Sequence, residues 1–285
     1  MDNWSFAEWL SLLSVRGVFT LVFASMVAAG VVGHFCHRLA VRYRMREQAG
    51  NNQESYLVSG MLGLLALLLA FTFSMALSRY EERRHLVLEE ANAIGTAYLR
   101  AQLLDEPHRT RLSAILVAYT DNRIDLSQGN SARPRELLAK NDALLTELWA
   151  AVVASRDSAL RHGVSTALLL SYNQLIDLDT SRKVARQVRV PGPVLLYLYA
   201  FLILTALVLG FVLNDHRSRA GAAVLFLLLA LYVGILDDIS RPVSGNIRES
   251  QQPLLILRDS LKAQPPAVFD RFAQPENARA IADRP

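Results

Sequence analysis

Four stretches of this chain are long, apolar and almost free of charge. They cover residues 14–35, 56–78, 190–213 and 220–236. A helix needs about 20 apolar residues to cross the hydrocarbon core of a bilayer, where every backbone polar group must be hydrogen-bonded internally. Helices of soluble proteins are usually shorter, at about 10–14 residues. The sequence therefore predicts an all-α integral membrane protein with four transmembrane helices.

The composition agrees with a membrane protein and excludes several other classes. Apolar residues make up 52% of the chain and charged residues only 20%, below the roughly 25% of soluble domains. The single cysteine, Cys36, excludes an internal disulfide and a thiolate-rich metal cluster. The net charge of +4 is spread over all segments, so no nucleic-acid partner is predicted.

The first apolar stretch is predicted to be a retained span and not a cleaved signal peptide. The residues before it contain Asp2 and Glu8 and no basic residue until Arg16, and no small-residue cleavage site follows cleanly. The short loop over residues 37–55 is rich in arginine, which favours a cytoplasmic position for that loop. Arginines also flank the other ends of the spans, so charge counting leaves the orientation open.

The segment between the second and third spans, residues 79–189, has a helical pattern throughout. No glycine or proline occurs from Leu64 to Ile94, so the second span is predicted to continue out of the bilayer as one rod of about 60 Å. Asp105-Glu106-Pro107 marks a break and a new helix start. We expect an extramembrane helical bundle here, and after the fourth span a polar C-terminal tail, residues 240–285, in which 250–262 form an amphipathic helix.

No group of residues has the spacing of a catalytic or metal site. The six histidines are scattered, and His34 and His37 are interpreted as a pair at the end of a span. Phosphate-binding loops and nucleophile motifs are absent from the sequence. Glu81-Glu82 and Glu89-Glu90 are predicted to form i, i+4 salt bridges on an exposed helix. The sequence therefore predicts no enzyme, no catalytic residue, no metal and no cofactor.

The second span carries two distinct stripes when it is drawn as a helix. Small residues form one stripe, which is predicted to pack against another helix: Ser59, Gly63, Ala66, Ala70 and Ser74. The opposite stripe is bulkier, ends in polar residues and supplies the pore-lining candidates: Leu64, Leu68, Phe71, Met75, Ser78 and Glu82. If several copies pack through the small stripe, the bulky stripe forms an apolar constriction with charges at its mouth. In the alternative interpretation, the small stripe packs within one chain and the bulky stripe faces lipid.

Two sequence motifs resemble the bacterial bestrophin-like domain family. The first is Leu67-Leu68-Leu69-Ala70-Phe71-Thr72-Phe73, followed by Arg79-Tyr80-Glu81-Glu82-Arg83-Arg84 and Glu90-Ala91-Asn92-Ala93-Ile94. The second is similar to the family's closing R-P-x-S-G-x-x-R, with Ser240 at a position where the family commonly has aspartate. The residues assigned to the family motif are Arg79, Tyr80, Glu81, Arg83, Asn92, Arg241, Pro242, Ser244, Gly245 and Arg248.

This family is distantly similar to the bestrophins, which are pentameric anion channels with a hydrophobic neck on their second helix. The resemblance implies a homo-oligomer, a pentamer if bestrophin-like, in the bacterial inner membrane, conducting small ions and in particular anions. It implies that Leu64, Leu68 and Phe71 form the neck, and that the bundle and both termini are cytoplasmic. The alternative function is a membrane sensor or scaffold that uses the bundle for interaction and has no conductance.

Overall fold

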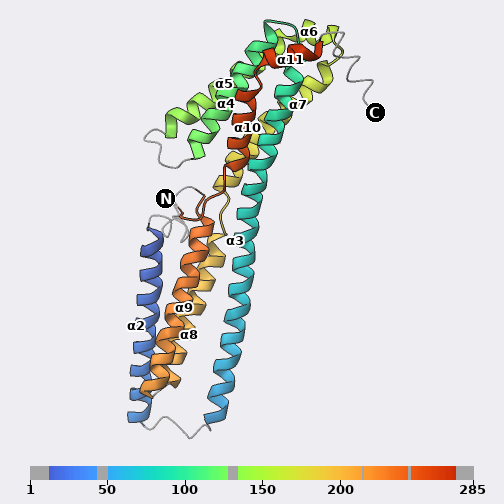
Figure 1. Cartoon of the computed structure of the whole chain (residues 1–285). Coiled ribbons are helices and arrows are strands. Elements are labelled where there is room, and N and C mark those ends of the chain that lie inside the picture. Colours follow the sequence, from blue (N-terminus) through green and yellow to red (C-terminus); the bar gives the residue numbers. More distant parts are fainter. Residues whose placement is uncertain (1–12, 44–50, 128–133, 214, 243–244, 274–285) are drawn as a thin grey trace, which may run out of the picture. The chain divides into compact units, whose positions relative to one another are not determined.

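The computed structural model describes residues 13–43, 51–127, 134–213, 215–242 and 245–273, and these residues form helices and short connections without strands (Figure 1). The all-α class is confirmed. Two sequence-based assignments, the motif residue Ser244 and the end of the tail over 274–285, lie outside the described residues. The described chain divides into two compact units, one within residues 1–80 and 188–248 and one within 81–187 and 249–285.

Four helical stretches are long and apolar enough to cross a membrane, as the sequence predicted: Val15–Arg42, Tyr56–Ala101, Ser165–Val212 and His216–Ser240. The first unit holds helices α2 (Val15–Arg42), α8 (Gly192–Val212) and α9 (His216–Ser240), which lie side by side (Figure 1). It also holds the first part of α3 (Asn51–Ala101). The N-termini of two of these helices have a local cause. At the start of α2 the Ser14 hydroxyl accepts a hydrogen bond from the Gly17 amide at 3.1 Å. Helix α8 begins directly after Pro191, since proline favours the start of a helix.

Helices α2 and α8 pack backbone to backbone. A Cβ atom added at Gly33 would lie 2.0 Å from the Leu207 carbonyl oxygen, and one added at Gly210 would lie 2.0 Å from the Gly30 carbonyl oxygen. Only glycine fits at such distances. Close approach of this kind is how membrane helices associate, because lipid removes the hydrophobic drive between them.

We expect Gly33→Ala to destabilise the first unit, because the added methyl group must push α2 and α8 apart. Overpacking of this kind costs about 1–3 kcal/mol, and the effect is measurable as a lower Tm of the purified protein in detergent. The matched control is Gly221→Ala on α9, where an added Cβ has nothing within 4 Å. Equal Tm values for the two variants would contradict the close packing.

The second unit contains the remainder of α3 and the smaller helices: α4 (His108–Ser127), α5 (Pro134–Ala154), α6 (Arg156–Arg161), α7 (Ser165–Gln187), α10 (Gln252–Ala263) and α11 (Pro266–Ala273). Its apolar core joins α3, α4, α5, α7 and α10. Leu254 and Leu261 of α10 are buried in this core, so the part of the tail predicted to be amphipathic is a packed element of the unit. Helix α11 was not predicted.

Helix α3 runs without interruption through both units, as the sequence predicted. Its 51 residues correspond to about 75 Å at 1.5 Å per residue. The helix ends at Ala101, and the chain turns before α4 through Asp105, whose backbone amide donates to the Ser158 hydroxyl at 2.8 Å. Helix α3 therefore carries both the membrane-spanning candidates and the charged motif that follows them.

Candidate pore-lining site on helix α3

Within the first unit, α3 is attached to its own chain along a single face. Leu65, Leu69, Thr72 and Ala76 are buried on this face. The hydroxyl group of Tyr232 on α9 donates a hydrogen bond to the Leu69 carbonyl oxygen at 2.7 Å, which adds a polar contact to the apolar packing. These positions share one side of the helix, because successive residues are rotated by about 100°. Among the described residues, no helix of this unit covers the rest of the span.

The small stripe predicted for helix packing is exposed in the single chain. All five of its members are solvent-accessible: Ser59, Gly63, Ala66, Ala70 and Ser74. A Cβ atom added at Gly63 would meet no other atom within 4 Å. The stripe therefore packs against none of the described helices of its own unit, and its contact with a neighbouring subunit stays a prediction.

The bulky stripe is exposed as well, with one exception. Leu68 is half-buried and packs against the core of the first unit. Leu64 and Phe71 have 60% and 62% of their surface exposed, and Met75, Ser78 and Glu82 are exposed too. Large apolar side chains this accessible in a membrane span meet either lipid or another copy of the chain. The pore-lining role of these residues stays a prediction.

The position of the buried face identifies a residue that the stripe analysis missed. At about 100° per residue, Leu67 and Ser74 lie opposite the centre of the buried face, and Phe71 and Ser78 lie next to them. If subunits form a ring in which the buried face of each α3 points outward, the opposite side of α3 points to the central axis of the ring. Leu67 has 52% of its surface exposed and thus joins Phe71 as a neck candidate. No sequence signal distinguished it from its leucine neighbours.

In the second unit, α3 contributes a buried carboxylate that the sequence analysis placed on the surface. Glu90 is fully buried, and its carboxylate forms ion pairs with Arg123 of α4, at 2.9 Å from Nε, and with Arg182 of α7. The predicted i, i+4 salt bridge is therefore wrong for Glu90. For Glu89 the i, i+4 spacing holds, but its partner is the His85 ring at 3.5 Å and not an arginine. The reason is that Glu90 shares its helix face with core residues, where a carboxylate persists only when it is paired.

The buried charges form a network that joins four helices. The Tyr119 hydroxyl donates to Glu90 Oε1 at 2.8 Å, and Arg123 Nη1 donates to Asp179 Oδ1 at 3.0 Å. Asn141 of α5 and Lys183 of α7 also contact the Asp179 carboxylate, at 3.0 and 2.7 Å. Burial, followed by the negative charge of Glu90, raises the pKa of Tyr119 well above its usual value. The phenol therefore stays a neutral hydrogen-bond donor.

The residues of the first family motif serve different local purposes. Arg83 is buried and pairs with Glu249 in the second unit. The Tyr80 hydroxyl donates to the Arg248 carbonyl oxygen at 3.4 Å, which joins the two motifs within the first unit. Arg79 lies exposed on α3. These contacts give Tyr80 and Arg83 a structural role.

The closing motif, residues 241–248, holds the turn after α9 in place through hydrogen bonds. The Asp238 carboxylate accepts hydrogen bonds from the backbone amides of Asn246 and Ile247 at 2.6 and 3.1 Å. A Cβ atom at Gly245 would lie 2.6 Å from the Asp238 carbonyl oxygen, so only glycine fits there. The Arg241 side chain bonds to Asp237 at 2.8 Å and to the Leu13 carbonyl oxygen at 2.6 Å, and Pro242 is half-buried. The motif therefore fixes the turn after the fourth span.

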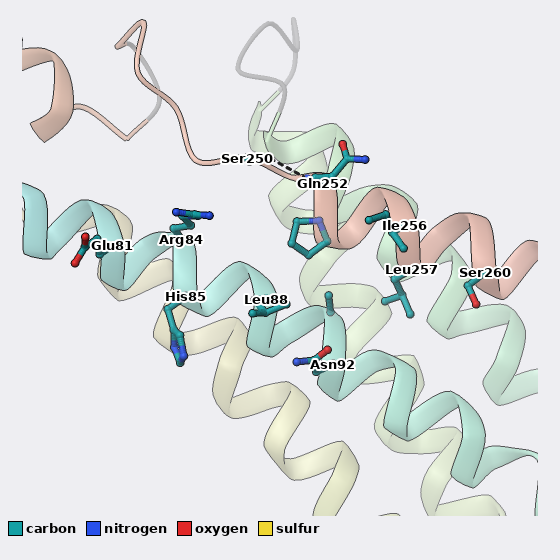
Figure 2. A pocket seen from close by; sticks show the side chains of 12 residues that line it. Glu81, Arg84, His85, Leu88, Asn92, Ser250, Gln252, Ile256, Leu257 and Ser260 are labelled. Carbon is teal, nitrogen blue, oxygen red and sulfur yellow. Dashed lines mark hydrogen bonds between the residues drawn. The ribbon is translucent and has the colours of Figure 1, made fainter.

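A groove of about 760 Å³ lies in the second unit between α3 and α10. Figure 2 shows side chains of α3 on one side, including the motif residues Glu81 and Asn92, and side chains of Ser250 and α10 on the other. Leu88 and Ile256 line it and are exposed, at 47% and 61%. The groove therefore lies entirely within the second unit.

Comparison with known proteins agrees with this architecture. A Trp-to-Ala variant of a bacterial bestrophin homologue from Klebsiella pneumoniae is 19% identical, with 89% of this chain and 98% of that chain aligned, at a TM-score of 0.60. A Tyr-to-Ala variant from the same organism is 17% identical, covers 89% and 98%, and has a TM-score of 0.61. A Pro-to-Ala variant described as a membrane protein is 16% identical, covers 90% and 99%, and also reaches 0.61. No curated protein sequence matches significantly.

The fold is therefore that of bacterial bestrophin homologues, built around four membrane-crossing stretches. The sequence also matches the bestrophin-like domain over residues 15–254. The chain belongs to the bestrophin-like family, and the resemblance drawn from its two motifs is confirmed.

Proposed function

We propose that this chain is the subunit of a homo-oligomeric ion channel of the bacterial inner membrane, with α3 lining the pore. The proposal rests on the exposure of α3. In the single chain, one face of its apolar span packs against the first unit, and most residues on the other faces are exposed. The bare surface contains a small stripe suited to close helix contact and large apolar side chains suited to a constriction. A ring of subunits accounts for both.

The likeness to bacterial bestrophin homologues supports this proposal, and the resemblance to bestrophin channels adds a pentameric ring and a preference for anions. The constriction would consist of Phe71 together with Leu64 and Leu67, whereas Leu68, which packs against its own unit, would support it from behind. A ring of apolar side chains blocks ions when the constriction loses its water, which is called dewetting. It conducts ions when the constriction is wide enough to remain hydrated. Ser78 and Glu82 follow on the same side of α3 and would line the wider vestibule.

Purified protein in planar bilayers under a potassium chloride gradient tests the proposal. We expect discrete conductance steps and a reversal potential with the sign of the chloride equilibrium potential. We also expect native mass spectrometry to give the mass of five copies of the chain. A reversal potential on the potassium side would retain the channel and overturn the anion preference. A silent dimer under several salts would overturn the channel and favour the sensor or scaffold.

A further inference from the structure

The first unit contains a cavity of about 190 Å³ between α2, α8 and α9, away from the candidate pore-lining face of α3. Its walls come from the second half of α2, the last turns of α8 and the first turns of α9. They are largely apolar, with contributions from Val27, Val31, Leu209, Leu213 and Phe226. Gly30 and Gly210 also line it, beside the close crossing of α2 and α8. The space suits an aliphatic chain.

Two basic side chains line this apolar cavity. The ring nitrogens Nδ1 and Nε2 of His34 are both buried and have no hydrogen-bond partner among the described residues. The same holds for Nε of Arg219. Buried polar atoms are nearly always paired, with protein, water or a ligand. The Arg219 Nε–H group and the ring N–H group of His34 therefore point to an acceptor that the described residues do not supply.

The surrounding charges define what that acceptor is. Arg219 is the cationic side chain among the residues that line the cavity with His34. Arg219 Nη2 lies 3.0 Å from His216 Nδ1, and Nε of the same guanidinium has no hydrogen-bond partner among the described residues. The nearest acidic residue on α9, Asp215, caps that helix by accepting from the Arg217 amide at 3.1 Å. The cavity end is thus positive and suited to an anionic oxygen.

We propose that this cavity binds an anionic amphiphile, with its carboxylate or phosphate oxygen on Arg219 and His34 and its acyl chain between α2, α8 and α9. Ligand pockets usually have about 300–1,000 Å³, so a cavity of about 190 Å³ holds only part of one chain. The remainder would continue over exposed Val31 into the bilayer. A fatty acid and an anionic phospholipid both have this chemistry.

Binding to the delipidated full-length protein in neutral detergent tests the site. The probes are oleate, its neutral ester methyl oleate, phosphatidylglycerol and phosphatidylcholine, each followed by native mass spectrometry and by the rise in Tm. We expect oleate or phosphatidylglycerol to bind and the two uncharged or zwitterionic probes to bind at least about tenfold more weakly, as expected for loss of a charge-assisted contact. Tighter binding of phosphatidylglycerol identifies a phospholipid, and tighter binding of oleate identifies a fatty acid.

Three variants locate the ligand. Arg219→Gln is expected to weaken binding of the anionic probe about tenfold, and Ala222→Leu is expected to weaken it by narrowing the cavity without changing charge. Arg217→Gln removes the same charge from an exposed position two residues away and is expected to bind like the native chain. Unchanged binding by Arg219→Gln, an equal loss in Arg217→Gln, or equal affinity for oleate and methyl oleate would overturn the proposal.

Discussion

Channels carrying Phe71→Ala are expected to conduct about tenfold better than the native channel. Phe71 has 62% of its surface exposed, lies in the middle of an apolar span and is next to the line opposite the attached face of α3. Truncation of this side chain to alanine in every subunit widens the proposed constriction and favours a continuous column of water through it. Lowering the barrier by about 1.4 kcal/mol corresponds to a tenfold faster passage. Single-channel recordings in planar bilayers measure the change directly.

A matched control separates the constriction from general effects on the span. Leu204 on α8 is also a large apolar side chain with about half of its surface exposed, at 51%, and it lies outside α3. Leu204→Ala is expected to leave the single-channel conductance unchanged, whereas Leu67→Ala is expected to raise it as Phe71→Ala does. Equal conductance of the Phe71→Ala and native channels would remove α3 from the pore.

The largest loss of stability is expected for Glu90→Ala in the second unit. Removal of the carboxylate leaves Arg182 buried without its counter-charge and Arg123 paired with Asp179 alone, and Tyr119 loses its closer acceptor. Breaking a buried ion pair on one side costs about 3–5 kcal/mol. The change is measurable as a reduced free energy of unfolding, or as a large fall in Tm, for the purified protein in detergent.

The neighbouring residue provides the control for this prediction. Glu89 lies in the same helical turn with 43% of its side chain exposed, and its ion-pair partner among the described residues is His85 at 3.5 Å. Glu89→Ala is expected to change stability by less than about 0.5 kcal/mol, as surface substitutions do. Similar losses for Glu89→Ala and Glu90→Ala would show that the buried network does not contribute as described.

The arrangement of the spans was predictable because lipid imposes a simple rule on the sequence. A stretch that crosses the bilayer has to be apolar for about 20 residues, and the four that qualify stand out by length alone. The continuity of α3 followed from the absence of glycine and proline between Leu64 and Ile94. Start signals such as Pro191 also act within a few residues of the helix they begin.

Features that depend on distant contacts could not be predicted in this way. Glu89 and Glu90 look alike in the sequence, and what distinguishes them is Arg182, which is 92 positions away from Glu90. Likewise, a helical wheel separated the small from the bulky positions on α3. Leu67 became a neck candidate only once the face of α3 that packs against its own unit was known. The cavity beside His34 and Arg219 requires three helices that are separated in sequence.

The glycine crossing between α2 and α8 limits how the first unit can change shape. Carbonyl oxygens meet the glycine backbone there with no side chain between them, so neither helix can slide or rotate without a collision. The attachment of α3 is different, because it is made by the side chains of Leu65, Leu69, Thr72 and Ala76 and by the Tyr232 hydroxyl. We therefore expect a rearrangement of the spans to keep α2 and α8 together, and to move α3 against them where side chains can repack.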